Sequence, residues 1–163
     1  MPSAALERHP ATPCAALRGI GVRVVAAAEN LSIVYLMEGD IERLRIAPRG
    51  ARPLWQHTCC ELFIAQPHGR YREFNFSPSG EWAAYEFEAY RKGARPLEIS
   101  PRMTLRRDPG KLELEVSLPE KAARIGLSAV IEETDGAISY WALRHAPGKP
   151  DFHHPDAFAM ELA

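Results

Sequence analysis

Two acidic residues stand in strand-like segments where their carboxyls could do chemistry. Glu61 lies in CCELFIA, a run that is apolar on both alternating faces, and Glu73 lies further along the chain in YREFNF. A buried carboxylate is costly unless it is paired or hydrogen-bonded. We therefore expect Glu61 either to form an ion pair with an arginine or to orient a ligand in a pocket. Glu61 with Glu73 is also the only carboxyl pair that we would propose for glycoside hydrolysis.

The segment RHAPGKPDFHHPDAF near the C-terminus gathers polar side chains among prolines, which predicts a loop. It carries His145, Asp151, His153 and His154. His145 or His153 could act with either glutamate as an acid–base pair in an enzyme. Metal binding by His145, Asp151 and His153 is conceivable, but adjacent histidines on an extended chain point apart. The ligand count that zinc needs is then not reached, and we expect no metal.

Three tryptophans, Trp55, Trp82 and Trp141, are candidates for a stacking surface. Each is either core, because indole area dominates core packing, or a platform on which a sugar ring lies flat. Trp55 follows Pro53-Leu54 in a loop-like stretch, and Trp82 begins a strand after a tight turn. The residues expected to contact a ligand are Trp55, Glu61, Glu73, Asn75, Trp82, Trp141, His145, Asp151 and His153. None of them is assigned a catalytic role.

The elements that must position these residues are short strands. Pro and Gly recur between segments rich in β-branched, aromatic and alternating residues, a pattern typical of an all-β, two-sheet antiparallel β-sandwich. In KLELEVSLP the apolar residues share one face of a strand. We predict strands over 21–27, 31–37, 41–47, 58–65, 71–77, 81–90, 101–107, 111–118, 127–133, 137–144 and 156–162, and one short helix over 120–125.

Alternation also assigns faces in the hairpin 71–90. The two phenylalanines of FNF are expected to pair with Tyr85 and Phe87 on the core face. This pairing would leave Glu73 and Asn75 beside Trp82 on the second face.

Length and charge limit the function classes. The chain has 163 residues, which suits a single domain spanning 1–163. The 20 basic and 21 acidic residues give a net charge of −1, so we expect no nucleic-acid or membrane partner. The three cysteines, Cys14, Cys59 and Cys60, lack zinc-site spacing and are expected to be reduced thiols. No secretory signal pattern is present, so we expect a cytoplasmic protein.

Three strings carry a resemblance to a known family: LWQHTCCELFI (54–64), YREFNFSPSGEWAAYEFEAYR (71–91) and VIEETDGAISYWALRHAPGKPDFHHPDAF (130–158). They resemble the motifs of the DOMON-like family, which is related to the family 9 carbohydrate-binding modules. The resemblance implies a jelly-roll sandwich with a ligand pocket on one sheet and its end loops. Sugar-binding relatives clamp the sugar between two tryptophans. Haem-binding relatives use a Met and a His, for which Met37 or Met103 would be the candidates here.

Three functions compete. The first is a non-catalytic ligand-binding module for a carbohydrate or a related small polar molecule, with no cofactor and with haem as a minor option. The second is an enzyme acting on a sugar-like substrate with a Glu/His acid–base pair. The third is a protein-interaction sandwich that uses an exposed sheet edge. A pocket lined by tryptophans and carboxylates would favour the first, and a large apolar patch without a cleft the third.

Overall fold

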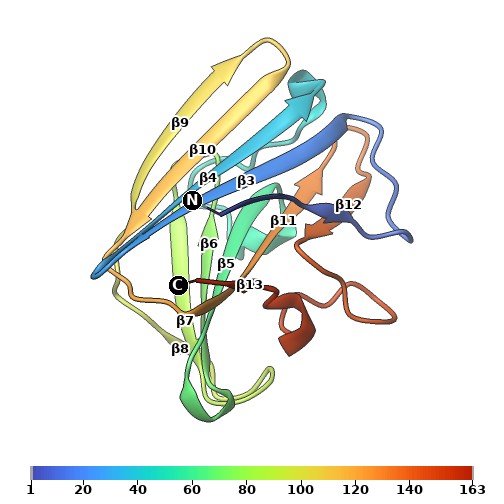
Figure 1. Ribbon diagram of the computed structural model, residues 1–163. Coiled ribbons are helices and arrows are strands. Elements are labelled where there is room, and N and C mark those ends of the chain that lie inside the picture. Colours follow the sequence, from blue (N-terminus) through green and yellow to red (C-terminus); the bar gives the residue numbers. More distant parts are fainter. Residues whose placement is uncertain (1, 163) are drawn as a thin grey trace.

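The computed structural model describes residues 2–162, which form two antiparallel β-sheets packed face to face (Figure 1). The five-stranded sheet has the order β1-β3-β4-β10-β9. The eight-stranded sheet has the order β2-β12-β11-β5-β6-β7-β8, and β13 pairs with β11. The predicted all-β sandwich is confirmed.

The strands of the five-stranded sheet are β1 Ser3–Ala5, β3 Leu17–Ala27, β4 Asn30–Gly39, β9 Arg102–Asp108 and β10 Lys111–Leu118. Those of the eight-stranded sheet are β2 Glu7–Arg8, β5 Cys59–Ala65, β6 Tyr71–Phe76, β7 Trp82–Phe87, β8 Arg95–Pro96, β11 Arg124–Glu132, β12 Ile138–Ala142 and β13 Met160–Glu161. Four short 3-10 helices, η1 Ile41–Arg43, η2 Leu54–Gln56, η3 Pro67–Gly69 and η4 Pro155–Ala157, lie in the connections.

The core lies between the sheets because apolar residues alternate along the strands that face each other. Leu114 of β10 pairs with Tyr35 of β4, and both are buried. Phe74 and Phe76 of β6 meet them from the other sheet. The Tyr35 hydroxyl donates a 2.8 Å hydrogen bond to the backbone carbonyl of Glu61 across the core. This bond holds the middle of β5 against the five-stranded sheet.

The predicted strand over 41–47 is wrong. Ile41–Arg43 forms a 3-10 helix, and the chain then crosses to the other sheet. There the Arg45 N–H donates to the Glu132 carbonyl at 2.8 Å. The segment connects the two sheets, so its apolar residues are buried without a strand ladder.

Two further predicted elements differ near the C-terminus. Segment 120–125 is not a helix, because the Glu120 side chain reaches across to an ion pair with Arg72 (2.7 Å) and β11 begins at Arg124. In 156–162 only Met160–Glu161 pairs as a strand. The residues before it form η4, which starts at a proline that cannot donate to a ladder.

The β6–β7 hairpin differs in register from the prediction. Its pairing begins with Phe76 opposite Trp82, so Tyr85 pairs with Glu73 instead of with a phenylalanine. Trp82 consequently packs against the core, while Tyr85 and Glu73 share the outer face. Because side chains alternate along a strand, a shift of one residue moves every side chain of β7 to the opposite face.

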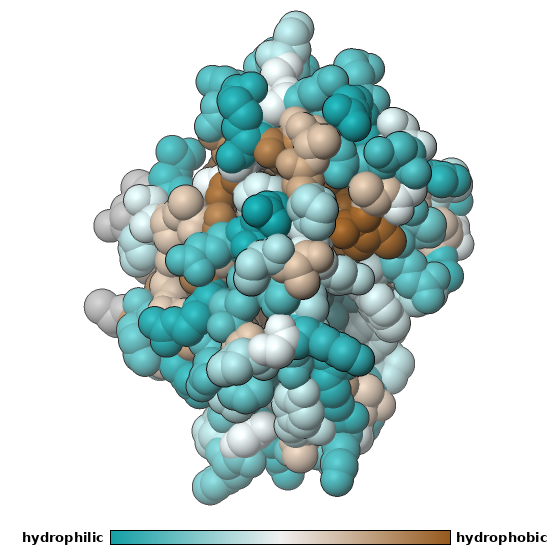
Figure 2. All heavy atoms as spheres, turned by 90° about the vertical axis from the view of Figure 1, so that its right-hand side faces the viewer, coloured by the Kyte–Doolittle hydropathy of each residue, from teal (hydrophilic) through white to brown (hydrophobic). Residues whose placement is uncertain are grey.

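The C-terminal segment 145–158 covers part of the outer face of the eight-stranded sheet. Phe152 and Phe158 pack there against Phe63 of β5. Gly126 of β11 permits the close approach, since a Cβ built at this position would stand 2.9 Å from the Phe158 ring. The segment lies on the right-hand side of Figure 1. Figure 2 shows that this side is mostly hydrophilic, with apolar residues confined to small areas.

The three cysteines are free thiols, and neighbouring side chains on a strand point apart, so Cys60 faces the core and Cys59 the outer face. Within residues 2–162, no helix has the length and apolar character that crossing a membrane requires.

Candidate functional site

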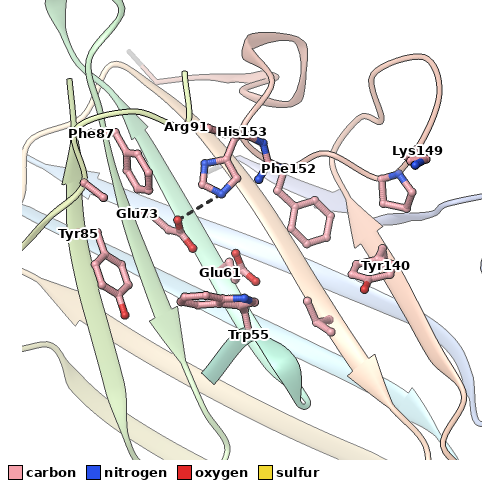
Figure 3. Close-up of a pocket in the computed structure, with 13 residues that line it drawn as sticks. Trp55, Glu61, Glu73, Tyr85, Phe87, Arg91, Tyr140, Lys149, Phe152 and His153 are labelled. Atoms are coloured by element: carbon pink, nitrogen blue, oxygen red, sulfur yellow. Dashed lines mark ion pairs between the residues drawn. The ribbon is translucent and has the colours of Figure 1, made fainter. Parts of the chain in front are cut away.

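A pocket of about 610 Å³ opens on the outer face of the eight-stranded sheet, beside the C-terminal segment (Figure 3). This volume is in the range of small-molecule sites. The lining comes from β5, β6, β7, β11, β12 and the loops around them. The lining residues are Trp55, Glu61, Glu73, Tyr85, Phe87, Arg91, Ala94, Val130, Tyr140, Lys149, Pro150, Phe152 and His153.

The floor of the pocket holds two carboxyls. Glu61 of β5 and Glu73 of β6 are 3% and 4% exposed, and their side chains hydrogen-bond to each other. Burial raises the pKa of Glu61 well above its ordinary value, and the charge of Glu73 and the hydrogen bond with it add to the shift. Burial also raises the pKa of Glu73, to about 7, against the opposing influence of the neighbouring Glu61 carboxyl and Asn75 amide. Every cause acts to raise the Glu61 pKa, and the Glu73 pKa is raised as well, so the pair holds a shared proton.

A histidine stands over this pair. The Nε2 of His153 lies 3.4 Å from a Glu73 carboxyl oxygen, and its Nδ1 lies 2.7 Å from the Tyr71 hydroxyl. The Arg91 backbone N–H donates to that hydroxyl at 3.0 Å, which leaves the Tyr71 O–H available to donate to Nδ1. The neutral tautomer with Nε2–H directed at Glu73 fits this arrangement. Burial lowers the pKa of His153 to about 4, and the charge of Arg91 acts in the same direction.

Hydrogen bonds to the Asp151 carboxylate hold the loop that carries His153 in place. The Arg91 guanidinium donates to Asp151 at 2.9 Å, the Tyr90 hydroxyl donates to the same carboxylate, and the His153 backbone N–H donates to it at 3.1 Å. The hydrogen bonds with Tyr90 and Arg91 hold the pKa of Asp151 below its usual value, although burial opposes them. Asp151 thereby links the β7–β8 turn to the C-terminal segment.

Aromatic side chains form the walls. Tyr85 and Phe87 of β7 stand on one side of the acid pair, and Phe152 and Tyr140 stand on the other (Figure 3). Trp55, in η2, remains 44% exposed and meets the Tyr85 ring edge-on at 6.1 Å. The pocket therefore presents aromatic faces around a polar floor.

The structure brings four of the sequence-predicted residues together in this pocket: Trp55, Glu61, Glu73 and His153. Asn75 lies beside Glu61 on the same face, fully buried, paired with it across β5 and β6. The side-chain amide of Asn75 lowers the pKa of Glu73, but neither its nitrogen nor its oxygen has a partner at hydrogen-bonding geometry. The Ser128 hydroxyl, opposite Glu61 on β11, is also unpartnered.

The other predicted residues lie elsewhere. Trp141 is 5% exposed in the core, where its indole N–H donates to Ser139. Trp82 packs on the core and lines a second depression, so no other tryptophan faces Trp55 and the predicted two-tryptophan clamp is wrong. His145 donates from Nε2 to the Glu7 carbonyl at 2.7 Å, outside the pocket.

The residues considered as metal or haem ligands do not converge. Asp151 accepts from the Arg91 guanidinium, and His145 donates to a backbone carbonyl. Within residues 2–162, no group of three or more His, Cys, Asp or Glu side chains is placed to hold a metal ion. Met37 and Met103 belong to the five-stranded sheet and pack in the core, so neither reaches the pocket.

The position of the acid pair corrects two expectations about Glu61. In the described part of the chain, Glu61 forms no ion pair with an arginine, and its partner is Glu73. Side chains in hydrogen-bonding contact are also closer than the roughly 5 Å that retaining glycosidases need between their carboxyls. This pair is therefore unsuited to glycoside hydrolysis.

Sequence reasoning missed most of the aromatic walls. Tyr85 and Phe87 were assigned to the core face, and the true register of the hairpin would have placed them beside Glu73. Phe152 immediately precedes His153 in the C-terminal loop, but tertiary contacts decide that it packs on the outer face of the sheet. No sequence signal distinguished Arg91 from the other arginines.

No protein-family model matches the chain, and no curated protein matches it in sequence. Among solved structures, it resembles a proposed carbohydrate-binding protein from Bacteroides uniformis ATCC 8492, with a TM-score of 0.67 and 13% sequence identity. The match covers 96% of this chain and 84% of that chain. At this identity the likeness establishes a shared fold. Membership of the DOMON-like family and jelly-roll connectivity stay predictions.

Proposed function

We propose that this protein binds a small, hydroxyl-rich ligand, with a carbohydrate as the first candidate, in the pocket on the outer face of the eight-stranded sheet. The observation that carries the proposal is the buried carboxyl pair of Glu61 and Glu73, which opens into an aromatic-walled cavity. Carboxyl oxygens accept hydrogen bonds from hydroxyls, and aromatic faces suit the C–H groups of a sugar ring.

Unpaired polar atoms support the proposal. The Asn75 amide and the Ser128 hydroxyl flank Glu61 on the two neighbouring strands and lack partners. Buried polar groups in folded proteins nearly always have partners, so these two groups beside the pocket floor call for one. The resemblance in fold to a proposed carbohydrate-binding protein agrees with this interpretation.

The test is a titration followed by tryptophan fluorescence and by calorimetry. The ligands are mono- and disaccharides, amino sugars and nucleotide sugars. We expect saturable binding of one class, with a fluorescence change that originates from the half-exposed Trp55. Trp55→Phe should remove most of that fluorescence change, and Trp55→Ala should in addition weaken binding about tenfold, the effect of one lost aromatic contact.

The matched control is Trp82→Phe, because Trp82 lies on the core side of β7. It should retain both affinity and signal change. If the whole panel produces no heat and no fluorescence change up to the millimolar range, the carbohydrate proposal is wrong.

A further inference from the structure

Within residues 2–162, the acid pair has no cationic partner. The titratable groups that face Glu61 and Glu73 are the Cys59 thiol of β5, Tyr71 of β6, Tyr85 of β7 and His153 of the C-terminal segment. The thiol and phenols are uncharged at neutral pH. His153 is also neutral there, because burial lowers its pKa to about 4.

The guanidinium of Arg91, which lines the pocket, is engaged elsewhere. Arg91 is paired with Asp151 at 2.9 Å, and its charge is the smallest of the influences on the pKa of Glu73. Lys149 stands on the far wall, beside Tyr140 (Figure 3). A negative charge on the floor therefore has no ion-pair partner within the described residues 2–162. Buried charges are normally paired, so this charge calls for a cation from outside the protein.

The walls suit an organic cation. The aromatic rings of Trp55, Tyr85, Phe87 and Phe152 surround the carboxyls (Figure 3). The negative faces of such rings attract ammonium groups, and cages of aromatic rings recognise them in many proteins. A bare metal ion fits less well, since within residues 2–162 no cluster of three or more ligating side chains is present.

We propose that the occupant of this pocket carries a protonated amino group, as an amino sugar does, and that Glu61 and Glu73 bind this ammonium between the aromatic walls. The inference rests on the proposed function, because it names the ligand class of the same pocket. The sugar ring would lie against Trp55, and the amine would point to the floor.

Proton release is a consequence that a neutral sugar does not share. Burial raises the pKa of Glu73 to about 7, so the pair is only partly ionised at neutral pH. A bound ammonium favours the ionised form and lowers both pKa values. Binding near pH 7 therefore releases protons to the buffer.

The experiment is calorimetry of the full chain with three ligands that differ at one position. Glucosamine, glucose and N-acetylglucosamine carry an ammonium, a hydroxyl and an acetamide on the same ring, and galactosamine with its analogues repeats the comparison. We expect the amino sugar of a set to bind at least about tenfold tighter than its analogues. Its binding enthalpy should vary with the ionisation enthalpy of the buffer, because protons are released.

Variants separate the acid pair from the rest of the pocket. Glu73→Gln and Glu61→Gln, each checked for folding by circular dichroism, should lose the preference for the amine and the proton release. Their affinity for the neutral sugars should fall less than their affinity for the amino sugar, so the ratio of the two affinities drops towards one. Glu115→Gln, at an exposed position of β10 on the other sheet, should behave as wild type.

The outcomes distinguish the two proposals. Equal affinity for the three analogues, or tighter binding of the neutral sugars, overturns the ammonium inference and leaves carbohydrate binding intact. Tight binding of ethanolamine with no response to any sugar supports the ammonium inference and contradicts carbohydrate binding. The absence of binding by every amine and every sugar overturns both.

Discussion

Glu61 and Glu73 share one proton in a place where neither carboxyl is fully hydrated. A buried acid lowers stability unless other groups satisfy it, and the unpartnered Asn75 amide and Ser128 hydroxyl beside the pair add to this cost. Strongly shifted carboxyls in a cleft are typical of functional sites. At the scale of single residues, the buried acid pair therefore lowers the stability of the fold, and it leaves two carboxyls at the pocket floor that can bind a ligand.

Truncating two of the tryptophans should lower the unfolding free energy by very different amounts. Trp141→Ala should cost about 3–5 kcal/mol of unfolding free energy, because it empties a buried site in the core. Trp55→Ala should cost about 1 kcal/mol or less, because the side chain is half in water. Urea denaturation of both variants measures the contrast. Similar costs for the two would show that Trp55 is structural and is not free to serve as a binding surface.

At the scale of elements, the C-terminal segment turns a sheet face into a pocket. It contributes His153 and Phe152, and it depends on Gly126 for its close packing. Hydrogen bonds at the start and in the middle of the segment hold it: His145 donates to a β2 carbonyl, and the Nδ1 of His153 bonds to the Tyr71 hydroxyl. A change in how this segment packs should therefore alter the pocket without disturbing the sandwich core.

Gly126→Ala tests that dependence. The added methyl would stand 2.9 Å from the Phe158 ring and 3.1 Å from the Ala157 carbonyl oxygen, so the segment must move outward. We expect a loss of about 1–3 kcal/mol in unfolding free energy and weaker ligand binding. Gly21→Ala is the matched control, because a Cβ at Gly21 in β3 meets nothing within 4 Å. Faster hydrogen exchange in segment 145–158 of Gly126→Ala alone would confirm the mechanism, and equal behaviour of the two variants would contradict it.

Sequence pattern predicted those elements whose structure depends on local alternation. β10 was predicted with its true bounds, because its buried and exposed residues alternate strictly. The register of β6 and β7 was missed, since only the pairing across the turn decides which face Tyr85 occupies. The pocket was half predicted for the same reason. Its two glutamates lie on predicted strands. Its aromatic walls depend on the register of β6 and β7 and on how the C-terminal segment packs against the sheet.

At the scale of the whole molecule, fold and site use different faces of the same sheet. One face of β5 and β6 fills the core, and the other carries the acid pair. Tyr35 joins the two by bonding the Glu61 backbone from the opposite sheet. The stability of the sandwich therefore depends on pH through groups that do not belong to its core.

Two opposing pH windows follow from the shifted groups. The pKa of Glu73 is raised from 4.5 to about 7, so between these values the folded state binds more protons than the unfolded state. Its contribution to the free energy of unfolding falls as pH rises through that window. The pKa of His153 is lowered from 6.5 to about 4, so there the unfolded state binds more protons. Its contribution is lost on acidification.

The two effects oppose each other below pH 6.5, and above this value the acid pair acts alone among these groups. Wild-type protein should therefore lose stability as pH rises from 6.5 through the folded-state pKa of Glu73 at about 7, with little further loss from Glu73 by about pH 8. Glu73→Gln should lack this loss and exceed wild type at about pH 8 by on the order of 2 kcal/mol, with the difference shrinking towards acid. Urea denaturation across the pH range measures it, and Glu115→Gln controls for the loss of an exposed acid. Parallel curves for wild type and Glu73→Gln would mean that Glu73 ionises as freely in the folded protein as in the unfolded chain. The acid pair would then carry its charge without penalty and have no need of a cationic ligand.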